Sequence, residues 1–182
     1  MKPSSVTTVM IAALIATGWA FLVCAGTAEA CGPRVEIEYY EGDGGDVFNI
    51  ANKSQEPWSV ASVVLSLVGS RGRVVFDTAD GGAGTSMHRP FSANAGNVGF
   101  IGATPVDDGS RVVALKFSDF SPGKSFSFIV DVDAKSPSGI DLPMVSDGDM
   151  EGATGEAEMV KASGDKVRAT GAFGREGKAV IG

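Results

Sequence analysis

Aspartates are the residues of this sequence with the clearest potential for chemistry. Asp131 and Asp133 stand two positions apart at the end of an alternating apolar segment, and Asp77 ends another short apolar segment. Residues two apart in a strand share one face and lie roughly 6–7 Å apart, so both acids face away from the neighbouring phenylalanines. Calcium takes six to eight oxygen ligands from carboxylates, backbone carbonyls and water. These three aspartates are therefore our candidate calcium ligands.

Two other interpretations of these aspartates stay open. A glycoside hydrolase uses two carboxylates roughly 5–9 Å apart, a separation that Asp131 and Asp133 could meet. Aspartates also end strands and populate turns for structural reasons alone, and no segment matches the twelve-residue calcium loop of an EF-hand. The spacing does not separate a metal site from a solvated strand end.

Aromatic residues offer a second kind of site. Trp58 and Tyr40 stand at the margins of strand-like segments, where an exposed ring can stack on a sugar. The same rings could instead pack against the core or at its rim. A carbohydrate-binding surface at Trp58 and Tyr40 is therefore the alternative to a calcium site.

Nucleophilic catalysis and zinc binding find little support. His88 is the single histidine, and the surrounding loop carries no recognisable nucleophile motif. A Ser-His-Asp site would depend on this residue, and the usual zinc ligand sets of histidine and cysteine cannot be assembled. We therefore expect no enzymatic activity. No cofactor is certain, and calcium is the one candidate.

The segment from Arg111 to Asp133 has the clearest strand pattern in the sequence. Large apolar residues recur at every second position on both sides of a turn: Val113, Leu115, Phe117, Phe126, Phe128, Val130 and Val132. The turn is Ser121-Pro122-Gly123-Lys124, in which proline presets φ and glycine tolerates a positive φ. This pattern predicts a β-hairpin whose apolar face needs a second layer.

Similar but shorter alternating segments fill the rest of the chain after residue 30. Strands are expected near residues 34–40, 46–52, 58–67, 73–76, 153–160 and 166–173, and residues 179–181 could add an edge strand. Residues 98–101 form a short apolar run. The glycine-rich segment 77–97 is expected to be loop. No segment keeps helical periodicity for a dozen residues. The sequence predicts an all-β, antiparallel β-sandwich of about eight or nine strands, forming a single domain over residues 31–182.

Residues 1–30 have the features of a secretory signal peptide. Lys2 precedes an apolar run, and Ala28-Glu29-Ala30 is a small-x-small cleavage pattern. The run of about 15 residues is short of the roughly 20 that a membrane span needs, although an uncleaved anchor stays an alternative. Cys31 would then be the remaining cysteine, so no intrachain disulfide is expected, and lipid attachment at Cys31 is a minor alternative. We expect an extracellular or periplasmic protein.

The charge of the chain narrows the choice of partner. The formal net charge is −7 at pH 7, and an acidic surface repels nucleic acid and anionic lipid headgroups. We therefore expect an extracellular or cell-surface protein or glycan as partner, no nucleic acid, and no membrane span once the signal is removed.

Several segments together resemble a known family. They are residues 35–37, 46–52, 62–67, 75–78 and 117–133, with Gly152-Ala153-Thr154 before the last strand pair. Over about residues 34–173 the chain resembles bacterial secreted proteins named after the sponge aggregation factor core. The resemblance implies calcium-dependent cell aggregation or adhesion and carries no catalytic residues. We therefore expect a non-enzymatic secreted protein for adhesion, aggregation or envelope structure.

Overall fold

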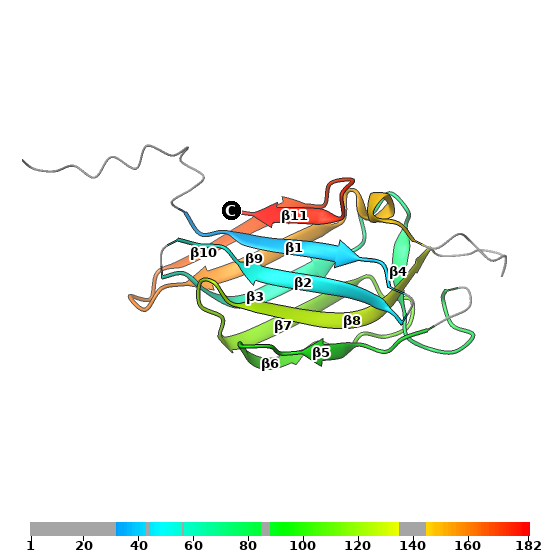
Figure 1. Ribbon diagram of the computed structural model, residues 1–182, viewed down its shortest axis with the longest axis horizontal. Coiled ribbons are helices and arrows are strands. Elements are labelled where there is room, and N and C mark those ends of the chain that lie inside the picture. The colour runs from blue at the N-terminus through cyan, green and yellow to red at the C-terminus, as the bar shows by residue number, and fades with distance from the viewer. Residues whose placement is uncertain (1–31, 43, 56, 85–87, 135–144) are drawn as a thin grey trace, which may run out of the picture.

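The computed structural model describes residues 32–42, 44–55, 57–84, 88–134 and 145–182. Its strands form two antiparallel sheets packed against each other (Figure 1). The expected antiparallel β-sandwich is therefore confirmed, with eleven strands in the described residues instead of eight or nine. The expected signal peptide and Cys31 lie outside these residues. Within them, no helix has the length and apolar character that a membrane crossing requires.

The two sheets contain six and five strands. The six-stranded sheet consists of β1 (Val35–Tyr40), β2 (Asp46–Asn52), β4 (Val74–Asp77), β5 (Ser92–Asn94), β8 (Ser125–Ala134) and β11 (Lys178–Ile181). Its order is β11-β1-β2-β8-β4, and β5 also pairs with β8. The five-stranded sheet consists of β3 (Ser59–Ser66), β6 (Gly99–Ala103), β7 (Val112–Asp119), β9 (Thr154–Val160) and β10 (Lys166–Ala172). Its order is β10-β9-β3-β7-β6.

The core lies between the sheets and follows the alternation in the sequence. Along β8 every second residue is buried, from Phe126 to Val132. The ring of Phe128 stacks on Phe48 of β2, with 4.9 Å between the centroids. The intervening residues of β8, Asp131 and Asp133 included, lie on the outer face and are only partly buried. The expected facing of this strand is confirmed.

The predicted hairpin between β7 and β8 is wrong. The turn is present, because the Lys124 N–H donates to the Ser121 carbonyl at 3.2 Å and Gly123 has a φ of 79°. The two strands nevertheless belong to different sheets, β7 between β3 and β6, and β8 between β2 and β4. The connection therefore passes from one sheet to the other, and Phe117 of β7 meets Phe126 of β8 with 5.1 Å between the ring centroids. Alternation shows which face of a strand is apolar. A hairpin within one sheet and a connection between two sheets both place that face toward the core.

β5 was not predicted as a strand, and β6 was predicted only as a short apolar run. β5 lies within the segment predicted to be loop and pairs with β8 from Ser92 to Asn94. All three of its residues are exposed, so it carries no apolar alternation that a sequence pattern could reveal. Its pairing places the preceding residues, His88 and Arg89, beside the C-terminal part of β8, near Asp131.

Candidate cation site

The three aspartates singled out in the sequence lie together on the outer face of the six-stranded sheet. β4 pairs with β8 so that Asp77 stands opposite Asp131, and Val75 stands opposite Asp133. Asp131 and Asp133 share a face because they are two residues apart. Each aspartate offers a carboxylate oxygen, and these oxygens all lie within 4.8 Å of one another. The β4–β8 pairing therefore assembles residues that are more than fifty positions apart in sequence.

The environment of Asp77 is unusual for an acid. Its exposed fraction is 3 %, and its Oδ1 is buried without a hydrogen-bond partner among the described residues. Like charges directly opposite each other on neighbouring strands destabilise a sheet, and Asp77 faces Asp131 in this way. A buried carboxylate oxygen without a partner, beside two further carboxylates, is the arrangement that a bound cation would stabilise.

A glycine-rich loop, residues 78–84, covers the carboxylates on the outer face of the sheet. Gly84 lies against them so closely that a Cβ atom added there would collide with Oδ2 of Asp77 and Oδ2 of Asp133. A Cβ added at Gly82 would collide with the carboxylate of Asp108 in the same way. Glycine at these positions therefore lets the loop backbone approach the acids, where backbone carbonyls are the ligands that calcium commonly adds to carboxylates.

Asp108 fixes this loop in place. Its Oδ1 accepts a hydrogen bond from the Thr78 N–H at 3.1 Å, and its Oδ2 accepts one from the Ala83 N–H at 2.7 Å. One carboxylate therefore binds the backbone at both ends of the loop. The backbone of Arg89 holds the other side, because its N–H donates to the Asp77 carbonyl and its carbonyl accepts from the Asp131 N–H, each at 3.1 Å.

The electrostatics of the cluster favour the neutral acids. Burial, followed by a hydrogen bond with Asp108 and the neighbouring charges, raises the pKa of Asp77 to about 7. Burial and the charge of Asp133 raise the pKa of Asp131 to about 6, against an opposing effect of His88. The pKa of Asp108 is lowered, because burial is outweighed by hydrogen bonds from Thr78, Asp77 and Ala83. A divalent cation among these oxygens would reverse the penalty for ionising Asp77 and Asp131.

The two aromatic candidates do not form a common surface. Tyr40 pairs with Val47 near the start of β2, whereas the Trp58 carbonyl accepts a hydrogen bond from Asn52 at the end of β2. The Trp58 ring packs against the core and lies 4.5 Å from the Lys161 ammonium. Tyr40 is 51 % exposed, and its hydroxyl donates to Glu38 at 2.6 Å. The two rings therefore lie at opposite ends of the sandwich.

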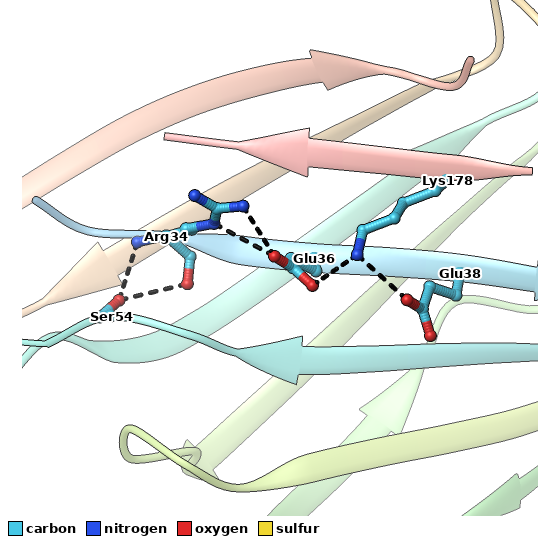
Figure 2. A network of polar contacts seen from close by, with 5 residues as sticks. All are labelled: Arg34, Glu36, Glu38, Ser54 and Lys178. Atoms are coloured by element: carbon cyan, nitrogen blue, oxygen red, sulfur yellow. Dashed lines mark hydrogen bonds and ion pairs between the residues drawn. The ribbon is translucent and has the colours of Figure 1, made fainter. Parts of the chain in front are cut away.

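A polar network next to Tyr40 covers the outer face of β1 and β11 (Figure 2). The Lys178 ammonium pairs with Glu36 at 2.8 Å and with Glu38 at 3.2 Å, and Arg34 pairs with Glu36 at 2.8 Å. The adjoining depression has a volume of about 60 Å³, far below the roughly 300–1,000 Å³ of ligand pockets. It is lined by Glu36, Glu38, Asn49, Ala51 and Lys53. Internally neutralised charges and a small volume indicate a solvated sheet face.

Gly84, Asp108 and Arg89 escaped the sequence reasoning about the site. Gly84 lies in the segment expected to be loop, and neither glycine nor aspartate indicates which strand a loop will cover. The spacing of two glycines around Ala83 is the only local signal, and it is common in loops. His88 is exposed. It does not belong to the carboxylate cluster, although its proximity lowers the pKa of Asp131.

Comparisons of the chain with protein-family models, with curated proteins and with solved structures found no match.

Proposed function

We propose that this protein is a non-enzymatic, exported β-sandwich that binds calcium at Asp77, Asp131 and Asp133 and serves in cell adhesion, aggregation or envelope structure. The observation that carries the proposal is the buried Asp77 carboxylate, which faces Asp131 across two paired strands and has an oxygen without a partner. A structural role alone would favour an uncharged residue at such a position.

The ligand types support calcium over other metals. All three candidate side chains are carboxylates, and oxygen-only sites suit calcium and magnesium rather than zinc or copper. Calcium tolerates irregular geometry and takes six to eight oxygens, whereas magnesium demands a near-ideal octahedron. Three strand-borne acids, with a loop backbone held against them by Gly84, form an irregular set of this kind.

The proposed setting fits the affinity that such a site would have. Extracellular calcium modules bind with a Kd of roughly 10⁻⁴–10⁻³ M, a range in which calcium outside the cell keeps the site filled. The signal-like start of the sequence and the resemblance to bacterial secreted proteins named after the sponge aggregation factor core support this setting. Calcium would hold β4, β8 and the covering loop together, and a rigid sandwich end is a suitable surface for adhesion.

Calorimetric titration of the purified protein with calcium chloride tests the binding, with magnesium chloride as the comparison. We expect saturable calcium binding and a rise in Tm with calcium concentration, because a ligand of the folded state stabilises it. Asp77→Asn should abolish both effects. Its Tm in EDTA at pH 7.5 should equal or exceed that of the wild type, because a buried charge is removed.

Glu156→Gln is the matched control, because Glu156 is an exposed acid on β9 of the other sheet. It should bind calcium like the wild type. Wild-type protein that shows neither heat nor a Tm shift with calcium would contradict the proposed metal site. Cell aggregation that is unchanged by deletion of the gene or by chelation would contradict the adhesion role.

A further inference from the structure

Asp46 is a buried acid that lies outside the carboxylate cluster and contacts the strand that carries it. Asp46 begins β2, and its exposed fraction is 4 %. The side chain of Asp46 is on the same inner face of β2 as Phe48 and Ile50. Asp131 and Asp133 are on the outer face of β8. Asp46 is therefore no candidate ligand, and its contacts have to explain why an acid is buried there.

Both oxygens of Asp46 accept hydrogen bonds from backbone N–H groups. Oδ2 accepts from Val132 at 2.9 Å, and Oδ1 accepts from Gly42 at 3.3 Å. The pairing of β2 with β8 ends where Asp46 meets Val130. The Val132 N–H lies just past this point, and the carboxylate of Asp46 takes the place of the next strand residue.

Val132 is the residue between the two cluster acids of β8. The opposite edge of this segment is held by the Asp131 N–H, which donates to the Arg89 carbonyl, and by the pairing with β4. On the edge that faces β2, the hydrogen bond of the Val132 N–H goes to Asp46. A shift of the backbone there moves both outer carboxylates relative to Asp77, because Asp131 and Asp133 are its direct neighbours in the chain.

We propose that Asp46 is the positioning residue of the cation site, acting through the Val132 N–H to hold Asp131 and Asp133 at the spacing a bound cation requires. This inference rests on the proposed calcium binding. Residues that orient metal ligands from behind typically change metal affinity by roughly 10–100-fold when they are mutated. Asp46 would thus tune affinity without touching the ion.

The other end of β2 supplies a matched control. Asn52 is also fully buried, and its Nδ2 donates to the carbonyls of Trp58 at 2.7 Å and Phe120 at 2.8 Å. Its Oδ1 also accepts from the Ser54 N–H at 3.1 Å. It therefore resembles Asp46 in strand, in burial and in bonding to backbone groups, and it lies at the end of β2 away from the aspartate cluster. Asn52→Ala should therefore destabilise the fold without changing the geometry of the cation site.

The test compares Asp46→Ala and Asn52→Ala in the full protein by calcium calorimetry and by thermal unfolding in EDTA. Both variants should unfold at lower temperature than the wild type. Only Asp46→Ala should bind calcium more weakly, by roughly 10–100-fold. Asp46→Asn keeps a carbonyl oxygen that can accept from Val132, so its calcium affinity should lie between those of the wild type and Asp46→Ala.

The outcomes separate this inference from the function on which it rests. If the wild type does not bind calcium, the proposed function fails, and this inference fails with it. If the wild type binds but Asp46→Ala binds equally well, or if Asn52→Ala is weakened to the same extent, the positioning role is overturned while the calcium site stands. If Asp46→Ala does not fold, Asp46→Leu, which has no acceptor for the Val132 N–H, decides by the same criterion, and wild-type affinity in it overturns the role.

Discussion

Gly84 shows at the scale of one residue how closely the covering loop approaches the acids. The position has no left-handed φ among the backbone values of the structure, so the requirement for glycine comes from space. A methyl group there would collide with Asp77 and Asp133. The side chain that is missing at residue 84 is therefore part of the site, as are the carboxylates.

Gly84→Ala should abolish calcium binding or weaken it at least tenfold, because the added Cβ pushes the carboxylates apart and lifts the loop. Titration calorimetry with calcium measures the effect. Gly102→Ala is the control, since a Cβ added at Gly102 meets no atom within 4 Å. Equal calcium affinity in Gly84→Ala and wild type would show that the loop backbone has no part in the site.

At the scale of elements, β8 is the strand on which both core and site depend. Its inner face contributes Phe126 and Phe128 to the core, and its outer face contributes Asp131 and Asp133 to the cluster. It pairs with β2, β4 and β5. The stability of this strand therefore sets the geometry of the acids.

Phe128→Ala should lower the free energy of unfolding by about 3–5 kcal/mol. The side chain is fully buried, and its ring contacts Phe48 at 4.9 Å and Phe91 at 5.1 Å between centroids. Urea melts of Phe128→Ala and of Ser127→Ala, a change on the outer face of the same strand, measure the difference. Near-identical midpoints for Phe128→Ala and wild type would contradict the inward facing of β8.

The sequence could predict strands better than their partners. Alternation located β8 and the facing of Phe128, because a half-buried strand must place apolar residues on one face. It could not separate a hairpin from a connection between sheets, since β7 and β8 present their apolar residues to the core in either case. β5 has no buried residue, so only its pairing with β8 identifies it.

The sequence could predict the acids of the candidate site. It could not predict the loop and the backbone groups that surround them. Asp131 and Asp133 share a face by their spacing alone. That Asp77 lies opposite them depends on the β4–β8 register, which is set by the packing of the whole sandwich. The covering loop has no periodicity, and its position follows from hydrogen bonds to Asp108 that join segments far apart in the chain.

Across the protein, two groups of acids have opposite effects on how stability depends on pH. Burial raises the pKa of Asp46 and of Asp77 to about 7 and that of Asp131 to about 6. Hydrogen bonds and ion pairs lower the pKa of several acids on the outer faces of the sheets, among them Glu36, bonded to Lys178, and Glu158, bonded to Arg168. The first group destabilises the fold as pH rises, and the second destabilises it as pH falls.

The signs of these shifts predict a stability maximum near pH 5 in EDTA. The buried acids bind more protons in the folded state, so their contribution is complete below their unfolded pKa of about 4 and is lost as pH rises to about 7. The ion-paired acids contribute above about pH 4.5 and lose their contribution below it. Between pH 5 and pH 8 the Tm should therefore fall, on the order of 5 °C for a loss of 1–2 kcal/mol.

Calcium should reverse this fall, because a bound cation favours the ionised carboxylates. At pH 8 a millimolar calcium concentration should raise the Tm, and at pH 5 it should have little effect, since protons then compete for Asp77 and Asp131. Thermal melts across this pH range, with EDTA and with calcium, measure both effects. A Tm in EDTA that climbs steadily from pH 5 to pH 8 would mean that the buried acids are ionised at little penalty. In that case a cation is not needed to stabilise the C-terminal part of β8, which carries Asp131 and Asp133.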